Sequence, residues 1–185
     1  MNKNFYGGRS DYFSLVERSY SQDIVVVNAE EHDTKMKYVL TCPADGTFGK
    51  DYKIRESHGL MVPLQIRNIV STDEFNRMFS YGGDDLGSIY YPTHTDFALW
   101  APTAVSVTLH IHRNKKVDSY PMKRSDHGVW RMRVEGDLSH ALYCYFVERN
   151  GCVVRSLDPY ALSSNGNGQY SAVINEELLK KVPFV

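Results

Sequence analysis

Two histidines spaced two residues apart offer the clearest chance of metal chemistry in this sequence. His110 and His112 lie in a run in which Val107, Leu109 and Ile111 alternate with polar residues, as in a strand with one buried face. Residues two apart on a strand point to the same side, so both imidazoles could face one metal ion. A zinc site needs three or four protein ligands, and no nearby motif supplies a third. The pattern favours a solvated strand face, and we predict neither a metal nor a cofactor.

Three aspartates suggest a second kind of chemistry, acid–base catalysis. Such catalysis commonly pairs an ionised carboxyl group with a protonated one. Asp126, Asp137 and Asp158 instead each lie in a turn sequence, respectively Ser-Asp-His-Gly, Gly-Asp-Leu and Asp-Pro-Tyr. Aspartate stabilises such turns by accepting hydrogen bonds from nearby backbone N–H groups. We predict structural roles for all three and no catalytic residue.

Aromatic residues, 12% of the chain, offer a third chemistry, the stacking of rings on a sugar. Both tryptophans fit a protein core better, because Trp130 shares a strand face with Met132 and Val134 and Trp100 ends an apolar run. Tyr90 and Tyr91 are our carbohydrate-binding candidates, and interfacial packing is the competing interpretation for them.

The elements that must position these residues are mainly short strands. Alternating or β-branched runs are separated by polar and glycine-containing turns, which is typical of small antiparallel sandwiches. A helix is predicted after Ser71 and Thr72, where an N-cap precedes two acidic residues and an apolar face. The predicted strands are 24–27, 36–40, 61–66, 105–112, 129–134 and 142–147.

Three glycines and two aspartates within residues 80–87 mark a domain boundary. We predict a first β-sandwich module over 1–80, a linker over 81–87, a second sandwich over 88–174, and a helical segment over 175–185. The predicted fold class is mainly β, with two consecutive small antiparallel, immunoglobulin-like sandwiches and one or two short helices.

Composition limits the partners of the chain. The 185 residues carry a formal net charge of −1 without long runs of like charge, which argues against nucleic acid and anionic membranes as partners. The N-terminus lacks the apolar core of a signal peptide, so we expect a cytoplasmic protein.

The three cysteines follow no zinc or redox spacing. If Asn150 and Gly151 form a two-residue hairpin turn, Cys152 lies opposite Arg149. Cys144 is then five positions away, about 16 Å along the strand, and cannot form a disulfide with Cys152.

An ordered set of motifs carries a family resemblance over nearly the whole chain. Residues 97–102 (Phe-Ala-Leu-Trp-Ala-Pro), 136–138 (Gly-Asp-Leu), 143–147 (Tyr-Cys-Tyr-Phe-Val) and 158–161 (Asp-Pro-Tyr-Ala) resemble the sandwich that precedes the barrel in starch-debranching enzymes. This sandwich is carbohydrate-binding module family 48. The motifs at 47–50, 54–59, 64–66 and 85–90 are similar to the N-terminus of type I pullulanases. The family-motif residues, expected to be structural, are Phe97, Trp100, Pro102, Gly136, Asp137, Asp158 and Tyr160.

The resemblance implies an accessory role. Enzymes of this family cut α-glucosidic bonds on a (β/α)8 barrel, which needs about 250 residues. This sequence has neither that length nor the family's D-G-x-R-x-D and N-H-D patterns. The expectation is therefore an N-terminal region excised from a pullulanase, a hydrolase of α-1,6-glucosidic branch linkages in pullulan, glycogen and starch, with no catalysis of its own.

The implied partners are an α-glucan (pullulan, glycogen or maltooligosaccharides) and the catalytic barrel of the parent enzyme. Homologous first modules are sometimes classed as carbohydrate-binding module family 68. Family 48 modules that bind glucan have a tryptophan after an Asn-Gly turn, where this chain has Cys152 and Val153. The alternatives are a purely structural docking module without sugar affinity, and an independent glycogen-binding protein.

Overall fold

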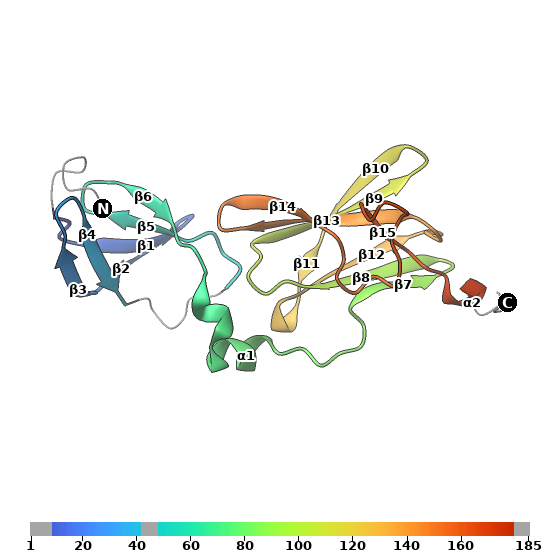
Figure 1. The fold of residues 1–185 in the computed structure, drawn as a ribbon, viewed down its shortest axis with the longest axis horizontal. Helices are drawn as coiled ribbons and strands as arrows, with labels where there is room; N and C mark the ends of the chain where they lie inside the picture. Colours follow the sequence, from blue (N-terminus) through green and yellow to red (C-terminus); the bar gives the residue numbers. More distant parts are fainter. Residues whose placement is uncertain (1–8, 42–47, 180–185) are drawn as a thin grey trace. The chain divides into compact units, whose positions relative to one another are not determined.

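A computed structural model describes residues 9–41 and 48–179 (Figure 1). The chain divides into two compact units, Met1–Ile66 and Arg67–Val185. Antiparallel strands are the main regular secondary structure of both units, so the predicted mainly β class is confirmed. No helix among the described residues is long and apolar enough to cross a membrane.

The first unit combines a four-stranded antiparallel sheet with a separate hairpin. Phe13, Leu15 and Ile24 form its buried core, and the Tyr38 ring of the hairpin lies 4.7 Å from the Phe13 ring. The sheet has the order β2-β1-β5-β6 and the hairpin is β3-β4. The bounds are β1 Phe13–Glu17, β2 Tyr20–Ile24, β3 Val26–Glu31, β4 Met36–Leu40, β5 Lys53–Glu56 and β6 Met61–Pro63.

Two of the predicted strands in this unit have different limits in the structure. The run 24–27 is divided, because Ile24 ends β2 with its side chain in the core and Val26 begins β3. The run 61–66 ends as a strand at Pro63, which lacks a backbone N–H. The predicted strand 36–40 is confirmed as β4.

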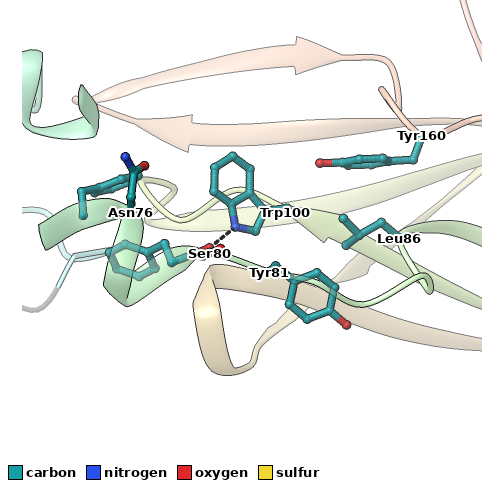
Figure 2. A pocket seen from close by; sticks show the side chains of 8 residues that line it. Asn76, Ser80, Tyr81, Leu86, Trp100 and Tyr160 are labelled. Carbon is teal, nitrogen blue, oxygen red and sulfur yellow. Dashed lines mark hydrogen bonds between the residues drawn. The ribbon is translucent and has the colours of Figure 1, made fainter. Parts of the chain in front are cut away.

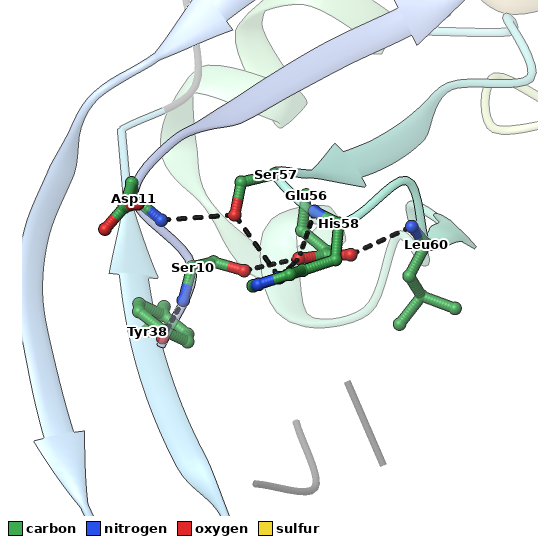
Figure 3. Close-up of polar contacts among 7 residues, drawn as sticks. All are labelled: Ser10, Asp11, Tyr38, Glu56, Ser57, His58 and Leu60. Carbon is green, nitrogen blue, oxygen red and sulfur yellow. Dashed lines mark hydrogen bonds and ion pairs between the residues drawn. The ribbon is translucent and has the colours of Figure 1, made fainter. Parts of the chain in front are cut away.

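The carboxylate of Glu56, 4% exposed, organises one end of this unit (Figure 3). It accepts hydrogen bonds from Ser10 Oγ (2.5 Å), from the backbone N–H groups of His58 (2.9 Å) and Leu60 (2.9 Å), and it contacts His58 Nδ1 at 2.8 Å. Burial by itself would raise the pKa of Glu56, but these hydrogen bonds outweigh burial and lower it from 4.5 to about 2. Glu56 is therefore held as an anion that joins β5 to the segment before β1.

The second unit is a sandwich of two antiparallel sheets (Figure 1). One sheet has the order β10-β9-β13-β14, with β15 also paired to β13, and the other has the order β11-β12-β8-β7. The shared core includes Phe97, Leu109, Tyr143 and Tyr145. The bounds are β7 Gly87–Tyr91, β8 His94–Trp100, β9 Ser106–Arg113, β10 Lys116–Pro121, β11 Lys123–Arg124, β12 Val129–Glu135, β13 Leu142–Arg149, β14 Cys152–Ser156 and β15 Ser171–Ala172.

Strand β9 confirms the period-two pattern seen in the sequence. Val107, Leu109 and Ile111 are at most 1% exposed and face the core. His110 and His112 lie on the opposite face, where they are partly exposed. One strand thus supplies both the centre of the core and part of a solvent-facing surface.

A short helix precedes this sandwich and belongs to the second unit. After the turn η1 (Asn68–Ser71), helix α1 (Asp73–Phe79) begins where Thr72 Oγ1 accepts a hydrogen bond from the backbone N–H of Phe75 at 3.2 Å. Phe75 and Phe79 are buried, and the indole N–H of Trp100 donates to the carbonyl of Phe79 at 2.8 Å. The predicted helix is confirmed.

The division between the units differs from the predicted one. The structure divides the chain after Ile66, whereas the sequence placed the first module over 1–80. The reason is that helix α1 packs against the Trp100 end of β8. Residues of the predicted linker 81–87 also contact the second sandwich, because Arg131 on β12 donates to Asp85 at 2.7 Å and to the Tyr81 hydroxyl at 2.8 Å.

The β13–β14 hairpin has the predicted turn. Asn150 (φ 50°) and Gly151 (φ 73°) form it, and Arg149 pairs with Cys152. Cys144 is buried on β13 opposite His110, so Cys144 and Cys152 are separate free cysteines. Cys42 lies outside the described residues. Helix α2 (Glu176–Leu179) lies in the predicted segment 175–185, of which residues 180–185 are not described.

Candidate functional site

The outer face of the β10-β9-β13-β14 sheet gathers aromatic and basic side chains from separate strands. The register places His110 beside Cys144, and Phe146 beside both Thr108 and Arg155. Residues paired across antiparallel strands share one face of a sheet. The side chains of His110, Phe146 and Arg155 therefore all point away from the core.

These side chains form two ring pairs linked by an arginine. The His110 and Phe146 rings are 4.3 Å apart at 39°, and the His112 and Tyr170 rings are 4.3 Å apart at 56°. The guanidinium of Arg155 lies over the Tyr170 ring, 4.5 Å from its centroid. We call His110, His112, Phe146, Arg155 and Tyr170 the outer platform. All five are partly or fully exposed to solvent.

A hydrogen-bonded loop holds Tyr170 in place. The side-chain Oδ1 of Asn165 accepts the backbone N–H groups of Gln169 (2.8 Å) and Tyr170 (2.9 Å). The backbone N–H of Asn165 donates to the Tyr170 carbonyl at 3.0 Å, and β15 then pairs with β13 through Leu142 and Ala172. The loop over residues 165–168 (Asn-Gly-Asn-Gly) thus positions the Tyr170 ring of the outer platform.

Burial affects the protonation of one histidine of the outer platform. Burial and the neighbouring His112 lower the pKa of His110, so His110 is largely neutral at pH 7. Ser119 Oγ lies 3.3 Å from His110 Nε2. Among the residues that the structure describes, no cluster of three or more metal-ligating side chains occurs, so the platform presents rings and hydrogen-bonding groups.

Partly exposed rings beside polar donors are suited to a sugar. The apolar faces of pyranose rings stack on aromatic side chains, and hydroxyl groups accept hydrogen bonds from arginine and histidine. A flat surface of this kind can contact several consecutive units of a chain. The five residues of the outer platform thus present aromatic rings, imidazoles and a guanidinium on one side of the sheet.

A second feature of this unit is an open pocket of about 360 Å³ beside Trp100 (Figure 2). Figure 2 places Asn76 on one side of the Trp100 ring, with Leu86 and Tyr160 on the other. The indole N–H is occupied, since it lies 2.8 Å from the Phe79 carbonyl and 3.1 Å from the His127 carbonyl. Trp100 is therefore only partly in the core, and its indole N–H is directed at the backbone.

An adjoining pocket of about 420 Å³ shares Trp100 and Asn76 with the first. Apolar side chains from β13, β14 and the following loop line it, among them Val147, Val154 and Pro159. Some of the large apolar residues that line the two pockets are exposed, including Val154 at 49% in this pocket and Tyr160 at 39% in the first. The two pockets form an apolar groove around Trp100, which we call the Trp100 groove.

Asp158 is a buried structural carboxyl group at the start of that loop. It accepts hydrogen bonds from the hydroxyls of Tyr143 (2.7 Å) and Tyr145 (3.3 Å) and from the backbone N–H of Tyr160 (2.9 Å). Its own backbone N–H donates to Ser171 Oγ at 3.0 Å. Burial raises the pKa of Asp158 despite these bonds. The network fixes the direction in which the chain leaves β14.

The predicted carbohydrate-binding tyrosines lie elsewhere. The Tyr90 hydroxyl donates to Asp137 Oδ1 at 2.9 Å, while Tyr91 is 44% exposed and stacks on His94 with ring centroids 4.6 Å apart. Both belong to β7, in the other sheet from the outer platform. Their role in sugar binding stays a prediction.

The other family-motif residues contact the backbone and the core. Phe97 is 1% exposed, and Pro102 is buried against Gly128. Asp137 accepts the backbone N–H of Ser139 at 2.9 Å, and Gly136 has a φ of 97°. Each contact is of the structural kind that the turn sequences predict.

Sequence reasoning missed the outer platform because its members are far apart in the chain. Phe146 alternates with core residues on β13, so its outward direction could have been read from the sequence. Tyr170 follows a glycine-rich loop, and no local pattern there indicates where its ring points. Only the register of β9, β13 and β14 brings these rings together.

Comparison with known proteins divides the chain in a similar way. Residues 1–71 match the Pullulanase N1-terminal domain, and residues 85–161 match Carbohydrate-binding module 48 (Isoamylase N-terminal domain). A Bacillus subtilis pullulanase is 33% identical over 161 residues, which are 85% of this chain and 22% of that protein. A 1,4-alpha-glucan branching enzyme of Aquifex aeolicus is 35% identical over 46% of this chain and 14% of its own length.

The fold comparison agrees with these matches. The crystal structure of the Anoxybacillus sp. LM18-11 pullulanase complexed with maltotriose has a TM-score of 0.87 and 31% identity to this chain. The similarity covers 96% of this chain and 26% of that one. The chain thus spans about a quarter of the length of the pullulanases that it resembles.

Proposed function

Since the chain consists of a pullulanase N1-terminal domain followed by a carbohydrate-binding module 48 domain, as in the N-terminal region of pullulanases, we propose that it binds α-glucan on behalf of such an enzyme. In this proposal the parent protein hydrolyses α-1,6-glucosidic branch linkages in pullulan, glycogen and starch. The chain itself performs no catalysis. Its partners are maltooligosaccharide segments and the catalytic barrel of the parent.

The observation that carries this proposal is the outer platform. Two ring pairs and one guanidinium on a single sheet face match the chemistry of sugar recognition. The solved pullulanase complex with maltotriose supports α-glucan as the ligand class.

Binding would assist hydrolysis through local concentration. A weak contact with a long glucan keeps neighbouring branch points near the catalytic site, because the second contact becomes intramolecular. We expect millimolar affinity for short sugars and larger apparent affinity for long chains. The gain comes from positioning, with no new chemistry on this chain.

The test is a calorimetric or NMR titration of the full chain with maltotetraose and with β-cyclodextrin. Phe146→Ala and Tyr170→Ala should each weaken binding about tenfold, since an aromatic–ligand contact contributes roughly 1–1.5 kcal/mol. Tyr91→Ala, another exposed aromatic change but on the other sheet, is the matched control and should leave binding unchanged.

The opposite result would place the sugar-binding site on β7, in the other sheet. If Tyr91→Ala abolished binding while Phe146→Ala did not, the tyrosines of β7 would be the sugar contacts. If neither sugar bound at millimolar concentration, α-glucan binding by the chain would be refuted.

The Trp100 groove favours a second candidate function, docking to the catalytic barrel. Its exposed apolar residues on β14 and the following loop resemble a surface that a protein partner covers. Tyr160→Asp should then weaken association between this chain and a separately produced barrel, as measured by calorimetry. Tyr170→Ala should leave that association intact.

A further inference from the structure

The outer platform contains a charged guanidinium, which a surface for a neutral sugar does not require. The register places thirteen described side chains of β9, β10, β13 and β14 on the outer face, together with the adjoining Tyr170. Arg155, His110 and His112 are the basic members, and Glu148 is the carboxylate among them. Glu148 Oε2 already accepts a hydrogen bond from Ser106 Oγ at 2.7 Å. The described outer face is therefore acid-poor.

The geometry of Arg155 leaves donors available to a ligand. Its guanidinium lies over the Tyr170 ring, 4.5 Å from the ring centroid, and one N–H group donates to the backbone carbonyl of Gln169. Arginine has five N–H donors in a planar fork, so the remaining ones are directed toward solvent at the edge of the platform. A guanidinium held by a ring and a carbonyl loses little further entropy when it binds an anion.

The two imidazoles add donors that respond to a bound anion. His110 and His112 are partly exposed beside the rings of Phe146 and Tyr170. A nearby dianion favours the protonated form of His110, whereas burial favours its neutral form. Once protonated, each imidazole donates from both ring nitrogens.

We propose that the outer platform prefers α-glucans that carry a phosphate monoester on a glucosyl unit, with Arg155 as the principal phosphate contact. The rings of Phe146 and Tyr170 bind the sugar, and Arg155 binds the phosphate oxygens. Arginine suits this task because its fork matches phosphate in a bidentate fashion. This inference rests on the proposed glucan-binding function and specifies its substrate class.

The experiment titrates the full chain with maltoheptaose and with maltoheptaose bearing one 6-phosphate, each at low and at high salt. At low salt the phosphorylated sugar should bind about tenfold more tightly, the gain expected of one charge-assisted hydrogen bond. High salt should reduce this ratio, because counterions screen an exposed charge.

Variants test whether Arg155 causes the preference for the phosphorylated sugar. Arg155→Gln should bring the ratio of the two affinities close to one, and Arg155→Lys should restore part of it. Lys123→Gln removes the same charge from β11 in the other sheet and should leave the ratio unchanged. Circular dichroism verifies that each variant is folded.

The outcomes separate this inference from the proposed function. If maltoheptaose binds but the ratio is one in the unmodified chain, or if Arg155→Gln leaves the ratio unchanged, the phosphate preference is refuted while glucan binding stands. If neither sugar binds, both proposals are overturned.

Discussion

Two buried carboxyl groups, those of Glu56 and Asp158, have pKa values shifted in opposite directions. Glu56 receives four hydrogen bonds, two of them from backbone N–H groups, and its pKa falls. Asp158 receives three, two of them from buried tyrosines, and burial still raises its pKa. The fold therefore stabilises the ionised form of Glu56. Ionisation of Asp158, by contrast, lowers the stability of the folded state.

Replacing Glu56 should destabilise the first unit substantially. Glu56→Gln removes the charge and turns one acceptor oxygen into a donor that faces existing donors. A pKa lowered from 4.5 to about 2 corresponds to about 3 kcal/mol at neutral pH. Amide hydrogen exchange in β1 and β5, read by mass spectrometry, should accelerate accordingly. Glu17→Gln, at a partly exposed carboxylate on β1, is the control, and an equal effect there would contradict the role of Glu56.

At the scale of elements, glycine is needed where the backbones of two segments come into close contact. Gly128 ends the turn η2 (Asp126–Gly128) with φ at 74°, and an added Cβ would lie 2.5 Å from Pro102 Cα. This turn lies against the end of β8 and brings the His127 carbonyl to the Trp100 indole. The close contact between this turn and the end of β8 therefore depends on one residue without a side chain.

Two glycine substitutions distinguish the destabilisation caused by this steric contact from that caused by a positive φ. Gly151 has nearly the same φ, 73°, but nothing lies within 4 Å of an added Cβ. Gly151→Ala should cost about 1 kcal/mol, from the positive φ alone. Gly128→Ala should cost about 3 kcal/mol or more, because the Pro102 backbone must also move. Both tryptophans belong to the second unit, so tryptophan fluorescence during urea unfolding measures both changes. Equal midpoints for the two variants would refute the clash.

The elements also show how far sequence reasoning reaches. The alternation around His110 predicted β9 and its buried side, and the Thr72 cap predicted α1, because both signals are local. The platform could not be predicted in the same way, since Tyr170 and His112 are neighbours only through the folded sheet. The division of the chain differed for a similar reason: the glycine-rich segment ending at Gly87 reads as a linker, yet Asp85 is tied to Arg131.

At the scale of the whole molecule, each unit has its own core and its own response to acid. The stabilisation from Glu56 is present above pH 4.5 and is lost as the pH falls toward about 2. The contribution of Asp158 has the opposite sign: it is fully present below the unfolded pKa and is lost as the pH rises through the raised folded pKa. Acid therefore weakens the first unit through Glu56 and relieves the second through Asp158.

We expect the strands of the first unit to lose amide protection before those of the second as the pH is lowered from neutral toward 3. Hydrogen exchange at several pH values, corrected for the intrinsic exchange rates, measures both units in one sample. In the Glu56→Gln variant the first unit should lose this acid sensitivity. Loss of protection in β9 and β13 ahead of β1 and β5 would contradict the expectation.

The outer platform has one more consequence, for how such a protein changes over generations. His110 and His112 alternate with Val107, Leu109 and Ile111 along β9 but lie on the opposite face from those core residues. If the platform binds glucan as proposed, substitutions that change its ligand preference can therefore accumulate on one face of β9 without disturbing the core behind it.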